Sequence, residues 1–194
     1  MRHIRKALRK HDVKTQQTDV FIQFLIDKVS LNDSAYDTLI LFNKSLTDSS
    51  CEMQAFSKLI ACIEPTLKAI IEHFKDQHSF ATFYTSISTV YKDPTYKNYL
   101  EYAANRIING KIHKIPNSRD VTNAIDNVRN SFIHYGGIPK IKIGGKDVDI
   151  KEFCIIVFAF LAKFYSTYHN PYWLEIIPVR WSLLRIKFMR IKWV

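Results

Sequence analysis

Hydrophobic residues recur every three or four positions along most of the chain, which is the spacing of the buried face of an α-helix. The pattern predicts helices within residues 19–29, 32–42, 53–63, 67–74, 79–91, 93–110, 117–137 and 152–168. Pro65 would remove a backbone hydrogen bond from any helix that contains it, so a break or kink is expected there. The β-branched and aromatic content of residues 79–91 also suits a strand, and their spacing favours a helix. The predicted fold class is therefore an all-α helical bundle.

Three stretches depart from this helical pattern. Residues 141–150 alternate apolar and polar side chains around Gly144-Gly145, which predicts a short β-hairpin. Residues 179–194 mix aromatic and basic side chains, and they fit either a strand or a basic amphipathic helix. This basic C-terminal segment could contact nucleic acid or a membrane surface, or it could be an edge element held on the core by its aromatic side chains. Residues 1–18 are polar and basic and predict a solvated tail, with a mobile arm or a frayed helix as alternatives.

The composition predicts a single domain over residues 1–194. Hydrophobic residues make up 47% of the 194 positions, which supports a substantial core and excludes a disordered chain. Five Gly and six Pro are few, which favours long regular elements over a loop-rich β fold. The 28 Lys and Arg outnumber the 18 Asp and Glu, which gives a net charge of +10. That excess favours a polyanionic partner, either nucleic acid or an anionic membrane surface, over a charge that serves solubility alone.

Cysteine usage and the lack of a targeting signal indicate a cytoplasmic protein. The three cysteines, Cys51, Cys62 and Cys154, form no C-x-x-C pair and are expected as reduced thiols in or near the core. The basic first residues lead into no apolar signal region. The apolar run of residues 153–162 is too short to span a bilayer, so no transmembrane segment is expected. Zinc spacing, a phosphate-binding glycine loop and a nucleophile elbow are all absent from the sequence, so neither a metal nor a cofactor is expected.

The helix predicted for residues 117–137 carries the most unusual polar pattern. Asn117 or Ser118 can cap its start, and two glycines end it, because glycine enters the left-handed conformation without steric cost. On a helical wheel an apolar face of Val121, Ile125, Val128 and Phe132 lies opposite a polar row of Asn123, Asn127, Asn130 and His134. Arg129 lies on the flank between the two faces. Asn is a poor helix former, so this row is either a solvated face that happens to be Asn-rich or a functional surface.

The segment Arg129-Asn130-Ser131-Phe132-Ile133-His134 resembles the Arg-Asn-x-x-x-His signature of HEPN-domain ribonucleases. The resemblance covers residues 117–165, and the rest of the chain matches only in being helical. It implies a HEPN-type helical bundle with a short hairpin after the motif helix. It also implies a homodimer in which the motif helices of two protomers face each other and form one solvated cleft for RNA.

The resemblance further implies metal-independent RNA cleavage, with the 2′-hydroxyl as nucleophile and a 2′,3′-cyclic phosphate as product. His134 would transfer the proton, since imidazole exchanges protons near neutral pH. Arg129 would bind two phosphate oxygens with its planar guanidinium. Asn130 lies one turn before His134 and would orient the imidazole or hold a phosphate or ribose oxygen. The other candidates for RNA contact are the asparagines lining the cleft and the lysines near the hairpin: Asn123, Asn127, Lys140, Lys142 and Lys146.

Three kinds of function fit these observations. The first is an endoribonuclease that acts as a toxin or phage-defence effector and is held silent by an antitoxin or another regulatory protein. Some relatives are controlled through a tyrosine two positions after the His, but here Tyr135 follows His134 directly and Gly136 takes that position. The second is a non-catalytic HEPN-like module for RNA, nucleotide or protein, in which Arg129 and His134 make structural hydrogen bonds. The third is an unrelated helical binder of nucleic acid or membrane surfaces that acts through residues 179–194.

Overall fold

The computed structural model describes residues 1–28, 34–74, 105–108, 111–114 and 118–169. Helices dominate these residues, so the mostly helical character predicted from apolar spacing is confirmed. The α-helices are α1 (Arg2–Arg9), α2 (Thr15–Lys28), α3 (Ser34–Ser45), α4 (Glu52–Phe74), α7 (Ser118–Tyr135) and α8 (Ile150–His169), and the 3-10 turn η1 (Ser49–Cys51) precedes α4. The described residues also form the antiparallel pairs β1 (Asn105–Ile108) with β2 (Lys111–Lys114), and β3 (Ile141–Ile143) with β4 (Lys146–Val148).

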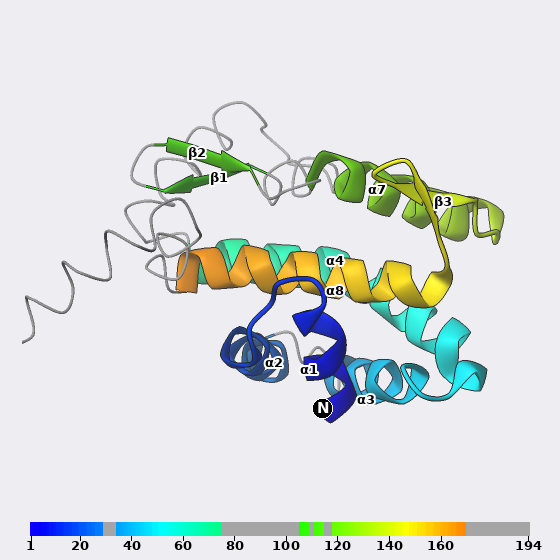
Figure 1. The fold of residues 1–194 in the computed structure, drawn as a ribbon, viewed down its shortest axis with the longest axis horizontal. Coiled ribbons are helices and arrows are strands. Elements are labelled where there is room, and N and C mark those ends of the chain that lie inside the picture. The colour runs from blue at the N-terminus through cyan, green and yellow to red at the C-terminus, as the bar shows by residue number, and fades with distance from the viewer. Residues whose placement is uncertain (29–33, 75–104, 109–110, 115–117, 170–194) are drawn as a thin grey trace, which may run out of the picture.

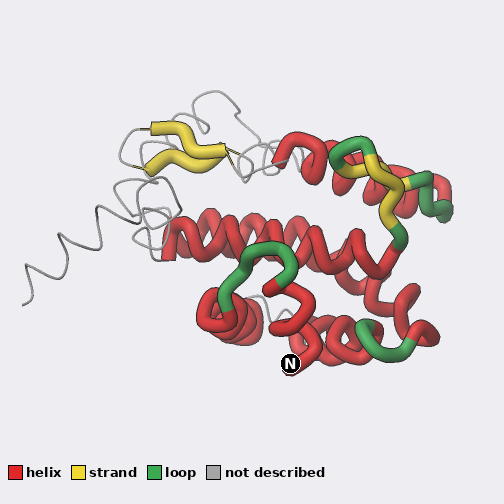
Figure 2. Tube along the Cα trace, in the orientation of Figure 1, coloured by secondary structure: helices red, strands yellow, loops and turns green. Residues whose placement is uncertain are grey.

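The helices form three layers (Figure 1). Helices α4 and α8 lie side by side in the middle, α1, α2 and α3 cover one side, and α7 covers the other. The β3–β4 hairpin connects α7 to α8 and packs against α7 through β3 (Figure 2). Because α7 is the outermost layer, one of its faces contacts the core while the opposite face is directed away from α4 and α8.

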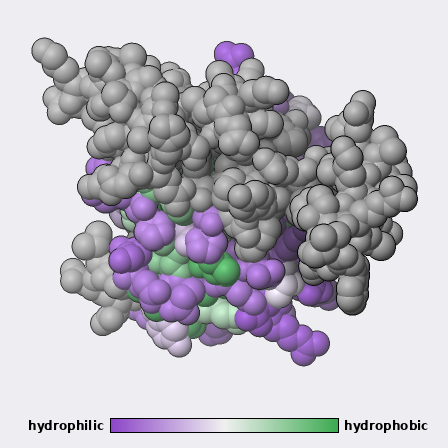
Figure 3. Space-filling model, turned by 90° about the vertical axis from the view of Figure 1, so that its left-hand side faces the viewer, coloured by the Kyte–Doolittle hydropathy of each residue, from purple (hydrophilic) through white to green (hydrophobic). Residues whose placement is uncertain are grey.

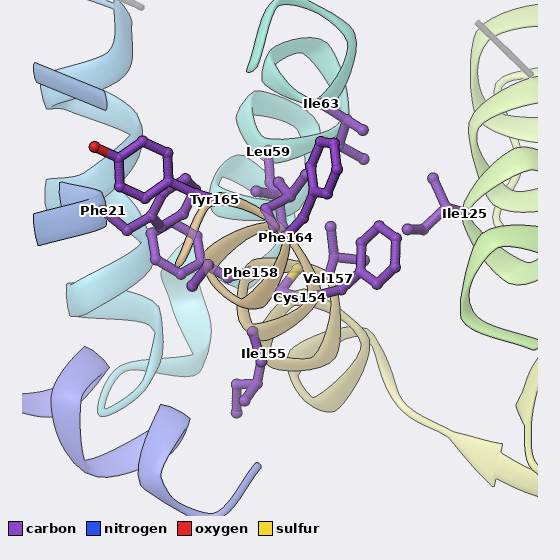
Figure 4. Packing of buried hydrophobic residues seen from close by; sticks show 14 of the residues in the cluster. Phe21, Leu59, Ile63, Ile125, Cys154, Ile155, Val157, Phe158, Phe164 and Tyr165 are labelled. Atoms are coloured by element: carbon purple, nitrogen blue, oxygen red, sulfur yellow. The ribbon is translucent and has the colours of Figure 1, made fainter. Parts of the chain in front are cut away.

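Helix α8 is the centre of the hydrophobic core. Its side chains are buried on nearly every side, and Phe153 and Phe164 are both 0% exposed. Phe158 packs edge-to-face on Phe21 of α2, with ring centres 5.3 Å apart, and Ile125 of α7 points toward α8 from the opposite side (Figure 4). A helix that is apolar all round requires partners on all sides. The prediction of a buried helix is therefore confirmed, and its partners belong to the same protomer.

The N-terminal residues are part of the fold, so the prediction of a solvated tail or mobile arm at residues 1–18 is wrong. Ile4 and Leu8 of α1 are both 0% exposed. They lie one turn apart on the same face of the helix, and α2, α3 and α8 pack around α1. Arg5 Nε also donates a hydrogen bond to Asp19 Oδ1 of α2 at 2.6 Å. The prediction relied on the many basic side chains of this segment and overlooked its short apolar stripe, which packs into the core.

Helix α4 continues through Pro65, so of the two alternatives expected at this proline, a break or a kink, the break is absent. The two helices predicted at residues 53–63 and 67–74 form one element from Glu52 to Phe74. Ile63 and Leu67, on either side of the proline, are both 0% exposed. Burial of this continuous apolar face offsets the backbone hydrogen bond that proline cannot make.

The hairpin predicted within residues 141–150 is confirmed. Strand β3 pairs with β4 in antiparallel register, with Ile141 opposite Val148. Gly144 and Gly145 at the turn have φ angles of +59° and +77°, and a type I′ turn requires positive φ at both central residues. Ile141 is 5% exposed, so its side chain anchors the hairpin to the core.

The prediction of one helix over residues 93–110 is wrong at its C-terminal end. Residues 105–108 form β1, which pairs antiparallel with β2, and Ile108 lies opposite Lys111. In the sequence, Asn109-Gly110 separates the two strands, and this dipeptide favours tight hairpins. The helical spacing of the preceding apolar residues conceals that signal, because a short apolar run fits either periodicity.

Several sequence-based predictions lie outside the described residues. They are the cap at residues 32–33, the helix at 79–91, the first part of the helix at 93–110, and the basic C-terminal segment at 179–194. Within the described residues, none of the helices combines the length and the apolarity needed to cross a bilayer. On the face drawn in Figure 3, the coloured surface is mainly hydrophilic and surrounds a smaller hydrophobic area.

Candidate functional site

Helix α7 has the extent and the stop predicted for the motif helix. It runs from Ser118 to Tyr135, and the N–H of Gly136 donates to the carbonyl oxygen of Phe132 at 3.1 Å. Gly136 has a φ of +66°, the left-handed conformation that ends many helices. Of the two residues expected to cap the start of this helix, Ser118 is its first residue and Asn117 lies outside the described residues. The motif residues 129–134 therefore lie on one uninterrupted helix, close to its C-terminal end.

The two faces of α7 have the predicted polarity. Ile125 and Val128 are 0% and 1% exposed, and Phe132 packs edge-to-face on Phe56 of α4 with ring centres 5.1 Å apart. The polar row on the opposite face is accessible to solvent. Asn123, Asn127 and His134 are exposed, and Asn130 is half-buried. The inner face thus fixes α7 on the core, and the row of amides and imidazole is available to a binding partner.

Arg129 lies on the flank between these faces and contacts α4. Its Nη2 donates to Oε2 of Glu64 at 2.8 Å, and 22% of the arginine side chain and 28% of the glutamate side chain are exposed. The other carboxylate oxygen of Glu64 is 2.8 Å from Nζ of Lys68, four residues further along α4. The guanidinium is therefore placed against a carboxylate, and an RNA phosphate would have to share or replace that partner.

Asn130 is hydrogen-bonded within α7. Its amide nitrogen donates to Oδ1 of Asp126, one turn toward the N-terminus, at 3.2 Å. His134 lies one turn in the other direction. Among the described residues, the amide of Asn130 thus has Asp126 as its partner, and the predicted orienting contact with the imidazole is not made in this conformation.

His134 is exposed near the end of α7. Its ring lies edge-to-face to that of Tyr135, with ring centres 6.4 Å apart, and no side chain in the described part of the chain hydrogen-bonds the imidazole. The five-residue separation of Arg129 and His134 corresponds to about 140° around a helix of 3.6 residues per turn. A single α7 therefore directs the guanidinium and the imidazole to different sides.

The three candidate lysines lie next to α7, on and just before the hairpin. Lys140, Lys142 and Lys146 are all exposed, and β3 packs directly against α7. Lys140 Nζ is 2.9 Å from Oδ2 of Asp147, and Lys142 lies opposite Asp147 across the two strands. The fold thus places these cations beside the motif helix, with one carboxylate among them.

A groove between α4 and α7 adds residues that the sequence analysis did not identify. It has a volume of about 610 Å³, and both Glu64 and Arg129 line it. Lys68 of α4 and Lys28, the last residue of α2, line it as well. The Glu64–Lys68 pair is detectable in the sequence, because residues four apart are neighbours on a helix. Lys28 comes from a distant segment, and no local pattern places it here.

Within the residues that the structure describes, no group of three or more His, Cys, Asp or Glu side chains is placed to hold a metal ion. Comparison with known protein families, curated proteins and solved structures finds no match to this chain. The resemblance to HEPN domains therefore stands on Arg129, Asn130 and His134 and on the helical character of the chain around them.

Proposed function

We propose that the protein is a metal-independent endoribonuclease of HEPN type that acts in the cytoplasm as a toxin or phage-defence effector. The observation that supports this proposal most is the position of His134. Its imidazole is exposed on the outer row of α7, outside the core, five residues after Arg129. An exposed imidazole in a row of asparagines suits proton transfer on a bound substrate better than it suits helix stability.

The proposed reaction needs no group beyond the side chains of two protomers. The 2′-oxygen of the RNA attacks the adjacent phosphorus, and the bond between phosphorus and the 5′-oxygen breaks. One His134 accepts the proton of the 2′-hydroxyl, and His134 of the partner subunit donates a proton to the departing 5′-oxygen. Arg129 stabilises the negative charge that develops on the phosphate oxygens. The products are a 2′,3′-cyclic phosphate and a 5′-hydroxyl.

Two protomers enter this proposal because one α7 supplies a single imidazole and directs Arg129 elsewhere. A twofold contact near the C-terminal ends of two α7 helices would bring two copies of His134 together. Two large apolar side chains flank His134 at the surface, with Ile133 52% exposed and Tyr135 86% exposed. Their burial would favour such a contact, since exposed apolar area is a common feature of protein interfaces.

The remaining candidate residues have supporting roles in this proposal. The asparagines Asn123 and Asn127 would line the shared cleft, and the lysines Lys140, Lys142 and Lys146 would bind the RNA backbone in a salt-dependent, sequence-tolerant way. Asn130 would hold a phosphate or ribose oxygen through its amide. An antitoxin or another regulatory protein would keep the enzyme silent by covering this surface.

The ion pair between Arg129 and Glu64 favours a second candidate function, a non-catalytic HEPN-like module that binds RNA, nucleotide or a protein partner. An arginine held by a half-buried carboxylate can serve to keep α7 on α4. In that case a lower melting temperature would be the main effect of Arg129→Ala, because the wild-type protein would have no RNA cleavage to lose.

The test is RNA cleavage by the purified protein in EDTA. The wild-type protein is expected to leave 2′,3′-cyclic phosphate ends, which mass spectrometry detects, and His134→Ala should lose about 100-fold or more of the activity. His3→Ala is the matched control, because it removes an exposed imidazole from α1. Circular dichroism should show the same fold for all three proteins. No cleavage by the wild type, or undiminished cleavage by His134→Ala, would contradict the nuclease proposal.

A further inference from the structure

The described residues that line the groove between α4 and α7 carry more positive than negative charge. Among the described residues that line it, Lys28, Lys68 and Arg129 are cationic and Glu64 is anionic. The cations come from α2, α4 and α7, so the fold gathers charges that are far apart in the sequence. This balance favours a ligand with more negative charge than the single carboxylate among these residues.

Glu64 indicates how an anion is held in the groove. Its Oε1 is 2.8 Å from Lys68 Nζ, and its Oε2 is 2.8 Å from Arg129 Nη2. A phosphate group presents its oxygens to such cations in the same way, because the guanidinium fork matches carboxylate and phosphate alike. The side chains of Glu64, Lys68 and Arg129 are 28%, 52% and 22% exposed, so a phosphate can approach them from solvent.

Apolar side chains make up the rest of the described wall of the groove. They are Ile60, Ala61, Pro65 and Ala69 of α4 and Ile133 of α7. Ile133 is 52% exposed, so a ligand in the groove would cover a large aliphatic side chain. An aliphatic wall of this kind can cover the apolar face of a base or ribose while the backbone contacts the cations. A volume of about 610 Å³ is in the range of pockets that hold small organic ligands, so a nucleotide-sized group fits.

We propose that this groove binds the phosphodiester backbone of single-stranded RNA, and that Glu64 is an internal competitor which an RNA phosphate displaces from Arg129. The inference rests on the proposed function in taking RNA as the ligand. Ile133 lines the groove and directly precedes His134, so the groove and the imidazole lie about 100° apart around the C-terminal part of the same helix. Lys68 stays beside Glu64 after the exchange and offsets the repulsion between carboxylate and phosphate.

The test measures binding of a fluorescent, single-stranded 2′-O-methyl RNA, which cannot be cleaved because its nucleophilic hydroxyl is blocked. Fluorescence anisotropy gives the affinity of the full chain at several salt concentrations. Lys28→Ala/Lys68→Ala is expected to weaken binding about tenfold or more, and to reduce the salt slope by at least about 0.7, since Lys28 makes one contact to the strand and each such contact contributes about 0.7. Glu64→Gln removes the competing charge and keeps the side-chain shape, so it should tighten binding about threefold.

A matched control removes two lysines from another surface. Lys6 and Lys10 are exposed on α1 and at its C-terminal cap, and α1 and α7 lie on opposite sides of the layer formed by α4 and α8 (Figure 1). Lys6→Ala/Lys10→Ala has the same net charge as the groove variant. It is expected to change the affinity by less than about twofold, because long-range attraction is screened within about 10 Å at ordinary salt.

The possible outcomes separate the groove from the nuclease. Equal losses in the two double variants, or no binding by the wild type, would overturn the groove as a binding site. Unchanged affinity of Glu64→Gln would overturn its role as competitor. Cleavage of ordinary RNA that requires His134, together with normal binding by Lys28→Ala/Lys68→Ala, would overturn the groove and leave the nuclease standing. Binding that depends on the groove, without any RNA cleavage, would support the groove and overturn the nuclease.

A second variant keeps the test decisive if the groove variant is poorly folded. Lys28 is exposed at the end of α2, so Lys28→Ala alone leaves the Lys68–Glu64 pair in place. This variant should melt like the wild type and reduce the salt slope by about 0.7. An unchanged slope would overturn the contact between Lys28 and RNA.

Discussion

Arg129 of α7 and Glu64 of α4 form a hydrogen-bonded ion pair between residues 65 positions apart in the sequence, with 2.8 Å between Nη2 and Oε2. Each side chain is less than a third exposed. The same carboxylate also contacts Lys68 through its other oxygen. The arginine of the motif therefore links the outer helix to the middle layer, and the pair contributes to stability as well as to the charge of the groove.

A double-mutant cycle on this pair measures its contribution. Glu64→Gln and Arg129→Gln are each expected to lower the free energy of unfolding by about 1 kcal/mol, since the pair is partly shielded from water. That corresponds to a decrease in melting temperature of about 2–4 °C for a chain of this size. Urea unfolding of the single and double variants should give a coupling energy of about 0.5–1 kcal/mol. Fully additive effects would show that the two side chains do not stabilise each other.

Removal of Ile4 tests the role of α1 in the core. Ile4→Ala deletes a fully buried side chain, so the free energy of unfolding should fall by about 2–5 kcal/mol. The melting temperature should fall by about 5–15 °C. Lys6→Ala on the exposed side of the same helix should stay within about 0.5 kcal/mol of the wild type. Wild-type stability of Ile4→Ala would mean that the first helix is not part of the fold in solution.

Alanine at the hairpin glycines tests the type I′ turn. The φ angles of Gly144 and Gly145 are positive, and an added Cβ at either position would have no atom within 4 Å beyond those of the glycine and its two chain neighbours. Any cost is therefore backbone strain, about 1 kcal/mol for each alanine in urea unfolding. Gly144→Asn should cost less, because asparagine tolerates this conformation. Gly137→Ala is the control, since Gly137 has an ordinary φ and an equally open surrounding, and it should be nearly neutral.

His73 gives stability a dependence on pH. Burial lowers the pKa of its imidazole below the ordinary 6.5, and the positive charges of Lys28 and His169 lower the pKa further. As pH falls, the unfolded state takes up this proton first, so it binds more protons than the folded state. The free energy of unfolding contributed by His73 is thus fully present above pH 6.5 and is lost below it. Because the side chain is largely exposed, the effect should be small.

The measurement compares the wild type with His73→Gln by urea unfolding between pH 7.5 and about 5. The difference in free energy of unfolding between the two proteins should shift in favour of His73→Gln as the pH falls. Using the difference removes the contribution of the carboxylates, which both proteins share. A difference that stays constant over this range would contradict the lowered pKa.

Cys154 is expected to resist alkylation in the folded protein. Burial raises the pKa of its thiol to about 12, and the negative charges of Glu52 and Asp149 add to this increase. The reactive thiolate is therefore scarce near pH 8. Cys62 is half-buried, whereas Cys51 and Cys154 are buried, so iodoacetamide should modify Cys62 first, as followed by mass spectrometry. In urea all three should react, and modification of Cys154 at the rate of Cys62 in the native protein would contradict the packing of α8.

Local sequence patterns predicted an element correctly where the residues of that element alone determine its structure. The turn glycines predicted the β3–β4 hairpin, and the nearly all-round apolarity of residues 152–168 predicted the buried position of α8. The same reasoning was wrong about a helix break at Pro65 and about a helix at residues 105–108. In the first case tertiary burial of α4 outweighed a local preference, and in the second a short apolar run was compatible with two periodicities.

In the candidate site, too, some features follow from the sequence alone and others only from the tertiary structure. The sequence alone determined the outward direction of the row that contains Asn123, Asn127 and His134, because the period of the helix fixes which side chains share a face. Only the tertiary structure decided that Arg129 meets Glu64 and that Lys28 lines the same groove. These relationships depend on which helices become neighbours, and that choice follows from the packing of the whole core around α8 and not from any local pattern of residues.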